Sequence, residues 1–273
     1  MREMHTFRQF VARYQLAVFF LLTYLISWSL VIPAQGGELA QGPMIAAFIG
    51  LAVVAGQQGT ADLWRQIKSW RVGWQWYLIA PGIVVAFHLC ALATNLLLGA
   101  TVTHTAHIRS LATYAGIVLD LLLLGGMWEE PGWTGYALPR FQQRFPRSPV
   151  IASLALGVFR MIWHTPLLIY GTIPWYDYIF YTFALQCLIS WLYNRTHGSV
   201  LIVMLLHLCS NVAFRTLYPL FGGSDQERYW ILETVFACAI TLGILVATRG
   251  RLGQEADATN DVAYADHLQP IGG

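Results

Sequence analysis

The chain has 273 residues, of which 56% are hydrophobic and 11% charged, and its formal net charge is +2. Soluble domains carry about 25% charged residues, so the composition is that of a membrane protein. The small net charge, without a long basic run, gives no support to nucleic-acid binding. All four cysteines lie in apolar stretches without a short metal-ligand spacing, which indicates buried thiols rather than disulfides or a cysteine–zinc cluster.

Eight apolar segments are candidates for membrane-spanning helices, which need about 20 mostly apolar residues, or slightly fewer where flanking side chains snorkel. In chain order they cover residues 15–33, 43–55, 76–98, 111–128, 150–163, 176–193, 199–218 and 229–248. The second and fifth segments are short. No convincing small-residue cleavage site follows the first segment, so we expect it to span rather than to be a cleaved signal peptide. The sequence therefore predicts an all-α fold, a polytopic membrane helical bundle of about eight transmembrane helices.

The basic residues support this layout through the positive-inside rule. With a cytoplasmic N-terminus, the outer loops hold two basic residues, Arg109 and Arg228. The inner segments hold twelve, namely Arg2, Arg8, Arg13, Arg65, Lys68, Arg71, Arg140, Arg144, Arg147, Arg195, Arg249 and Arg251. An even number of spans fits this asymmetry. We therefore expect a multi-pass protein of the cell membrane with both termini in the cytoplasm.

Hydropathy and motif content divide the chain into four regions. Residues 1–110 hold the N-terminal spans, with an interfacial helix predicted at about residues 62–75, where Trp and Arg interleave. Residues 111–218 carry the polar groups described below, and residues 219–248 form the last span. Residues 249–273 are polar and lack hydrophobic periodicity, so we expect a disordered cytoplasmic tail. The lipid bilayer is the first predicted partner.

Two adjacent carboxylates, Glu129 and Glu130, follow an apolar run in which Asp120 is the only charged residue. An ionisable side chain at bilayer depth costs roughly 2.5–3.5 kcal/mol on insertion scales, which makes it a candidate functional residue. Taken alone, the pair is equally compatible with a point where a membrane helix meets water. Polar groups on two later helices favour the functional interpretation.

His207 and Asn211 stand four residues apart on an otherwise apolar helix, so they share one face one turn apart. A His and an Asn on one stripe at membrane depth favour a polar cavity over a satisfied core. His164 precedes Thr165 and Pro166, where the helix is expected to end or kink. Taken alone, His164 is better explained as an interfacial residue beside a tryptophan.

Together these groups supply what hydrolysis of a peptide bond needs. A carboxylate takes a proton from water, and imidazole and amide groups stabilise the developing oxyanion. Imidazoles and carboxylates are also zinc ligands, although the chain has no H-E-x-x-H motif. No Ser lies in a G-x-S-x-G setting, and no Cys has an obvious activating partner in the sequence. The sequence therefore favours carboxylate-driven or metal-assisted hydrolysis.

Three motifs occur in a fixed order between about residues 111 and 218. They are Glu129-Glu130 with Gly132-Trp133-x-Gly135-Tyr136, then Trp163-His164-x-Pro166, then Asn194-Arg195-Thr196-x-Gly198-Ser199 leading to His207-x-x-x-Asn211. In this order and spacing they resemble the CPBP family, the intramembrane proteases of the CAAX-prenyl-protease and bacteriocin-processing type, also called Abi proteins.

The resemblance implies a role for each matching residue. Glu129 is similar to the catalytic glutamate that activates water, and Glu130 to the second glutamate of that motif. His164 matches a histidine that assists water activation or binds metal, and His207 and Asn211 match a pair that holds the oxyanion or completes a metal site. Zinc or another divalent metal, held by Glu129, His164 and His207, and a metal-free glutamate mechanism both remain open. The implied substrate is a peptide or a membrane-associated protein, with prenylated proteins as one possibility.

The chain departs from the family pattern at two positions. Thr134 stands where the first motif usually has Arg, and Arg160 stands where the second usually has Phe, four residues before His164. We hypothesise that Arg160 supplies the guanidinium that position 134 lacks and pairs with Glu130, because an unpaired buried charge costs several kcal/mol. Thr134 and Arg160 would then orient the site without taking part in bond cleavage.

The interpretation that follows is a multi-pass membrane hydrolase whose active-site cavity opens toward the inner leaflet. The alternative is a non-catalytic membrane binding or immunity protein that retains the polar cavity, and the changes at positions 134 and 160 favour it modestly. A transporter comes third, since the chain lacks the repeated halves with interrupted helices that many transporters show.

Overall fold

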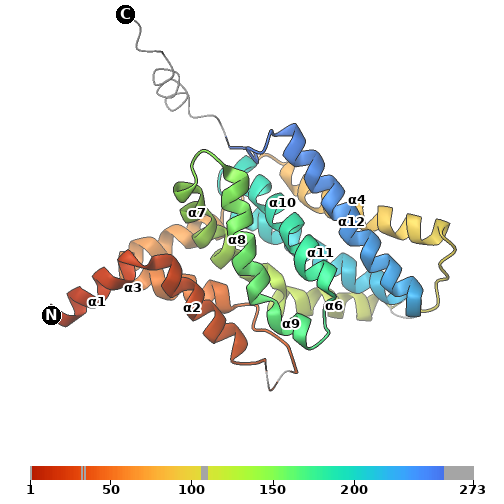
Figure 1. Cartoon of the computed structure of the whole chain (residues 1–273), viewed down its shortest axis with the longest axis horizontal. Coiled ribbons are helices and arrows are strands. Elements are labelled where there is room, and N and C mark those ends of the chain that lie inside the picture. The colour runs from red at the N-terminus through yellow and green to blue at the C-terminus, as the bar shows by residue number, and fades with distance from the viewer. Residues whose placement is uncertain (1, 32, 34, 106–109, 255–273) are drawn as a thin grey trace, which may run out of the picture.

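The structure is a computed structural model that describes residues 2–31, 33, 35–105 and 110–254. These residues form helices and their connections, without a strand, which confirms the all-α class (Figure 1). The elements are α1 (Arg2–Arg13), α2 (Gln15–Trp28), α3 (Gly42–Ile67), α4 (Trp76–Leu97), α6 (Leu111–Leu124), η1 (Gly126–Glu129), η2 (Pro131–Ala137), α7 (Leu138–Arg144), α8 (Pro149–Trp163), α9 (Thr165–Ile169), η3 (Asp177–Tyr181), α10 (Thr182–Arg195), α11 (Val200–Leu217), η4 (Tyr218–Leu220) and α12 (Gly223–Ala247).

Within the described residues, five helical stretches are long and apolar enough to cross a membrane. They are α3, α4, the run from α6 to α7, α11 with η4, and α12. A sixth would result if α1 and α2, which meet at an 89° bend, count as one span. The chain is thus a multi-pass helical membrane protein, but the predicted count of eight is not confirmed. One reason is that α8, at 15 residues, is shorter than a membrane span normally requires.

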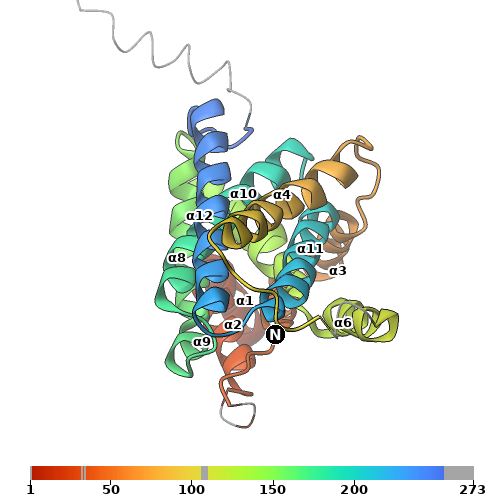
Figure 2. The same cartoon turned by 90° about the vertical axis from the view of Figure 1, so that its right-hand side faces the viewer.

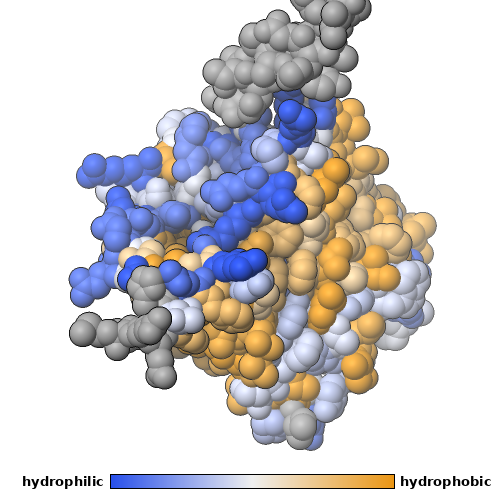
Figure 3. All heavy atoms as spheres, turned by 60° about the vertical axis from the view of Figure 1, so that its left-hand side comes forward, coloured by the Kyte–Doolittle hydropathy of each residue, from blue (hydrophilic) through white to orange (hydrophobic). Residues whose placement is uncertain are grey.

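Helix α3 is longer than the apolar segment from which it was predicted. It runs for 26 residues and kinks at Gly56, whose φ of +62° is readily adopted by glycine. Residues 62–67 of the predicted interfacial helix are therefore the end of α3, and turns follow as far as α4. Hydrophilic residues gather over one part of the surface, beside a broad hydrophobic band (Figure 3).

One end of the bundle is held together by side chains near the ends of several helices. Tyr193 of α10 donates its hydroxyl to Gln66 of α3 (3.1 Å), and Ser199, before α11, donates to the Ser69 carbonyl (2.7 Å). Asn194 accepts a hydrogen bond from α7 and donates to the Leu252 carbonyl after α12 (2.8 Å). We call this the basic end, because it carries Arg65, Lys68, Arg71, Arg140, Arg144, Arg147, Arg195, Arg249 and Arg251.

The opposite end of the bundle has its own set of contacts. Asn95 of α4 donates to the Asp225 carbonyl of α12 (2.9 Å), and Thr103 donates its backbone N–H to Leu220 of η4 (3.0 Å). Trp230 of α12 donates to Asp177 of η3 (3.0 Å). The connection between α2 and α3, helix α9 and the start of α12 therefore lie together, away from the basic end (Figure 1).

The core lies where α2, α3, η2 and α8 meet. Trp133 and Tyr136 of η2 are fully buried, and Phe20 of α2 stacks on Phe159 of α8 with ring centroids 3.9 Å apart. Gly132 touches the backbone of Pro43 so closely that any side chain would collide with it. This close approach fixes η2 against α3. Helix α6 packs far less and projects to one side (Figure 2), with only Leu121 buried.

The start of the predicted tail is described and the rest is not. Residues 249–254 turn back onto the basic end, where Leu252 is fully buried. Residues 255–273 lie outside the described part of the chain, as does Arg109, which was counted among the outer-loop residues.

Candidate active site

Both candidate glutamates lie where α-helical geometry is interrupted. Helix α6 ends at Leu124, a 3₁₀ turn carries Glu129, and the π-helix η2 begins at Pro131, directly after Glu130. Single π turns of this kind occur frequently at functional sites because they redirect side chains within a helix. As a result two consecutive carboxylates both point into the protein, with Glu129 5% exposed and Glu130 fully buried.

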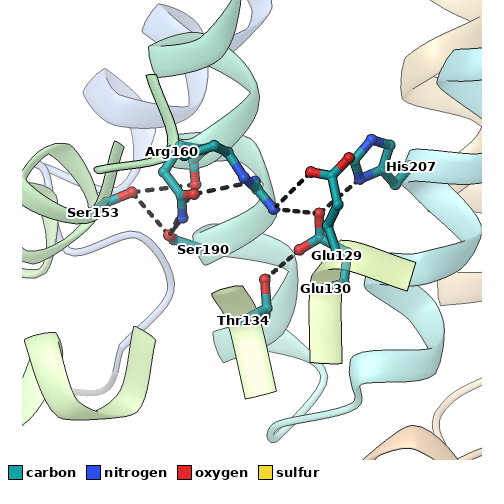
Figure 4. A network of polar contacts seen from close by, with 8 residues as sticks. Glu129, Glu130, Thr134, Ser153, Arg160, Ser190 and His207 are labelled. Atoms are coloured by element: carbon teal, nitrogen blue, oxygen red, sulfur yellow. Dashed lines mark hydrogen bonds and ion pairs between the residues drawn. The ribbon is translucent and has the colours of Figure 1, made fainter. Parts of the chain in front are cut away.

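Both carboxylate oxygens of Glu130 have partners (Figure 4). Oε1 accepts a hydrogen bond from Arg160 at 2.6 Å and lies 2.7 Å from Nδ1 of His207. Oε2 accepts a short hydrogen bond from the Thr134 hydroxyl. Each oxygen of Glu130 is therefore occupied by at least one protein partner, and Glu130 anchors residues from η2, α8 and α11.

The hypothesised Arg160–Glu130 pair is present in the structure. Arg160 is 2% exposed, and it also donates to Gln186 of α10 at 3.1 Å. Thr134, at the position where the family usually has Arg, supplies a hydroxyl to the same carboxylate. Because each buried charge has a partner of opposite charge and further hydrogen bonds, the two departures compensate one another.

Glu129 differs from Glu130 because it keeps an unused oxygen. Its Oε2 is buried without a hydrogen-bond partner among the described residues and lies 3.9 Å from the Arg160 guanidinium. A Cβ added to Gly126 would lie 2.8 Å from Oε1 of Glu129, 2.6 Å from Nε2 of His207 and 3.0 Å from Nδ2 of Asn211. Three polar atoms thus converge on a hollow that stays open because residue 126 has no side chain.

This hollow belongs to a cavity of about 290 Å³. The cavity brings together five of the predicted site residues, Glu129, Arg160, His164, His207 and Asn211. Glu130 and Thr134 lie behind its wall. Groups from η1, α8 and α11, far apart in the sequence, therefore surround one space, and His164 belongs to it rather than to an isolated interfacial position.

Glu38 is a site residue that sequence reasoning missed. Its Oε2 lies 3.3 Å from Nδ1 of His164, its side chain is 4% exposed, and its Oε1 has no partner within the described chain. Burial raises the pKa of Glu38. Burial lowers the pKa of His164, but the hydrogen bond and charge of Glu38 outweigh this, so its net pKa is raised. Glu38 lies in a connection 126 residues before His164, and no spacing in the sequence links the two.

The residues do not fit a catalytic zinc ion well. In the described chain, potential ligand atoms of Glu129, Glu130 and His207 lie within 4.8 Å of one another. The predicted ligand His164 does not belong to this group. Glu130 is already used on both oxygens, and the Arg160 guanidinium lies beside the carboxylates. Glu129 and Nε2 of His207 remain, whereas catalytic zinc normally has three protein ligands.

A second buried polar group lies beside the cavity without lining it. Nδ1 of His88 on α4 is 2.9 Å from the Tyr229 hydroxyl on α12, and its Nε2 is 3.6 Å from Glu233. Neither His88 nor Glu233 lines the cavity. Glu233 thus provides a buried glutamate against which changes at Glu129 can be compared.

The fold and site define a multi-pass membrane protein with a buried glutamate, two histidines and an arginine around a polar cavity. Comparison with protein families matches residues 111–213 to the type II CAAX prenyl endopeptidase Rce1-like family. This segment is therefore similar to the CAAX proteases, which confirms the resemblance seen in the motifs.

Among curated proteins, a similar one is CAAX prenyl protease 2 of Methanococcus maripaludis, which is 32% identical over 106 residues. The similarity covers 35% of this chain and 38% of that relative. Comparison with solved structures found no match.

Proposed function

We propose that the protein is an intramembrane endopeptidase that uses Glu129 to activate water. The observation that carries this proposal is the hollow at Gly126, where Glu129, His207 and Asn211 converge beside the Arg160 guanidinium. Glu129 is a general base in position, because its Oε1 borders the hollow and its Oε2 has no hydrogen-bond partner among the described residues, and the cavity has room for water.

The hydrogen-bond pattern suggests how the work is divided. We assign the Nδ1–H of His207 as the donor to Glu130, which leaves Nε2 facing the hollow, where it orients the water. Glu129 takes a proton from that water, and the oxygen of the water attacks the peptide carbonyl. The amide N–H of Asn211 stabilises the oxyanion. The C–N bond then breaks, and Glu129 returns the proton to the leaving amine.

His164 lines the same cavity. Glu38, in the connection between α2 and α3, contacts its Nδ1. A carboxylate bonded to Nδ1 fixes the orientation of an imidazole and presents Nε2 to its surroundings. We assign His164 to hydrogen bonding with the substrate or the attacking water. Glu130 and Arg160 keep His207 and Glu129 in place and do not take part in bond cleavage.

The substrate is proposed to be a peptide or a membrane-associated protein. The name of the relative in Methanococcus maripaludis describes a protease of CAAX prenyl substrates. A prenylated C-terminal peptide is therefore the first substrate to test, beside the same peptide without its lipid.

Glu129→Gln in the purified full chain tests the proposal, with cleavage of these peptides followed in detergent micelles. We expect the rate to fall by about 10²–10⁴-fold, the range that a general base contributes. The matched control is Glu233→Gln, the same change at another buried glutamate, which should cleave at the wild-type rate. Undiminished cleavage by Glu129→Gln contradicts the mechanism. Peptide binding without cleavage by the wild type supports the non-catalytic alternative.

A further inference from the structure

Asp177 is an acidic residue of the active-site cavity that the proposed mechanism does not use. It is the first residue of η3, which leads into α10 and lies outside the five spanning stretches, and it lines the cavity. Its Oδ1 accepts a hydrogen bond from the Trp230 indole of α12 at 3.0 Å. Its Oδ2 has no hydrogen-bond partner among the described residues. One oxygen therefore holds the carboxylate in place, and the other is available to a ligand.

Asp177 differs from the other two carboxylates that line the cavity because it has no basic neighbour. Glu38 lies 3.3 Å from His164, and Glu129 lies 3.9 Å from Arg160. Within the described part of the chain, no Arg, Lys or His side chain forms an ion pair with Asp177. Burial raises the pKa of Asp177 to about 6, so the carboxylate is still mostly ionised at neutral pH. A partly buried charge without a partner is costly, and a positively charged ligand would relieve that cost.

Asp177 lies about one helical turn from a contact beside the hollow. Tyr181, four residues further along η3, also lines the cavity, and its hydroxyl is 2.5 Å from the Ser210 hydroxyl of α11. Ser210 directly precedes Asn211, whose amide is proposed to stabilise the oxyanion. Helical residues four apart are neighbours on one face. A substrate whose cleaved bond lies beside Asn211 would therefore place a nearby side chain close to Asp177.

Much of the remaining cavity lining is apolar. It includes Trp163, Leu167, Ile173 and Leu185. An apolar wall with one unpaired carboxylate fits a Lys or Arg side chain, whose methylene stem packs on apolar surface while its charged head pairs with an acid. A neutral aliphatic side chain would fill the same wall and leave the Asp177 charge without a partner.

We propose that Asp177 is a specificity residue that selects substrates with a lysine or arginine close to the cleaved bond. The proposal rests on the proposed function, since it concerns the substrate of the same site. Asp177 pairs with the substrate side chain and takes no part in bond cleavage. The competing explanation is a structural one, in which the carboxylate serves only to hold Trp230 of α12.

Peptides that differ at one residue test the proposal. Lysine or norleucine, which has a similar aliphatic chain without the ammonium group, is moved position by position along one otherwise identical sequence. The ratio of kcat/KM for each lysine and norleucine pair is measured in micelles. Asp177→Asn removes the charge and keeps an oxygen that accepts the Trp230 hydrogen bond. The matched control is Glu227→Gln, the loss of an exposed acid of α12 that does not line the cavity.

We expect the wild type to prefer lysine at one position by about 10–100-fold, the range of a hydrogen bond to a charged group. Asp177→Asn should bring this ratio close to one, chiefly by slower cleavage of the lysine peptide, while Glu227→Gln should keep the wild-type ratio. Asp177→Lys should reverse the preference toward glutamate at the same position. A wild-type ratio near one at every position overturns the proposal. Equal losses for both peptides in Asp177→Asn also overturn it and assign the residue a structural role.

Binding without turnover separates this proposal from the proposed function. Fluorescent forms of the same peptides are titrated into Glu129→Gln and into the double variant Glu129→Gln with Asp177→Asn. Tighter binding of a lysine peptide by the first protein and not by the second supports the role of Asp177, and equal binding by the two proteins contradicts it. If the wild type cleaves none of the peptides, the proposed function fails, and these affinities then decide the role of Asp177 by themselves.

Discussion

Removing the Arg160 guanidinium should destabilise the fold because it leaves Glu130 charged and fully buried. Arg160 lies 2.6 Å from Glu130 and is 2% exposed. At this distance and an effective dielectric constant of about 20, Coulomb's law gives an attraction of about 6 kcal/mol, part of which offsets the desolvation of the two ions. Loss of one partner of a buried pair typically costs about 3–5 kcal/mol. For Arg160→Met we expect about 3 kcal/mol, since His207 and Thr134 still contact the carboxylate.

The assay is reversible unfolding in mixed micelles, with the free energy of unfolding measured for each variant. The double variant Arg160→Met with Glu130→Gln removes the uncompensated charge and should recover most of the loss. The matched control is Arg65→Met, which breaks a pair whose arginine side chain is 72% exposed and should cost about 0.2–1 kcal/mol. A loss below about 1 kcal/mol for Arg160→Met, or strictly additive losses in the double variant, would refute the reasoning.

Four further predictions concern the site. Glu38→Ala should lower kcat more than it changes KM, because His164 loses its orienting partner, while Glu38→Gln should restore part of the rate; equal rates for the three proteins contradict this role. Gly126→Ala should abolish cleavage by filling the hollow, whereas Gly116→Ala on α6, where a Cβ meets nothing within 4 Å, should be silent. Cleavage should survive a zinc chelator, and metal analysis should find less than one ion per chain. Because the pKa of His164 is raised on folding, its contribution to the free energy of unfolding should be complete below about pH 6.5 and decline as the pH rises through its higher folded-state pKa, and Glu38→Ala should remove that decline.

Local sequence patterns predicted the helical elements well, because apolar runs and helix-breaking residues act over short distances. The spacing of His207 and Asn211 placed both on one face of α11, and both line the cavity. The Arg160–Glu130 pair was also predicted, because the chain lacks an arginine at position 134 and has an additional one at position 160, and a buried charge needs a partner. In the first case the information lay within a single helix. In the second it came from the requirement that buried charges be paired.

The sequence did not predict features that depend on contacts between distant segments. In the sequence, Glu38 looks like an ordinary acidic residue of a loop. Only the packing of α2, α3 and α8 brings this loop next to His164. The length of the spans was also missed, because α3 continues past the kink at Gly56 into residues that read as interfacial.

The third motif contains two parts with separate tasks. His207 and Asn211 face the cavity, but Asn194 joins α7, α10 and the segment after α12 at the basic end. Ser199 caps α11 and also bonds to Ser69 after α3. A relative could therefore retain Asn194 and Ser199, which hold the bundle together, after it has lost catalytic activity. The presence of the first half of the motif indicates the fold, and only the second half indicates catalysis.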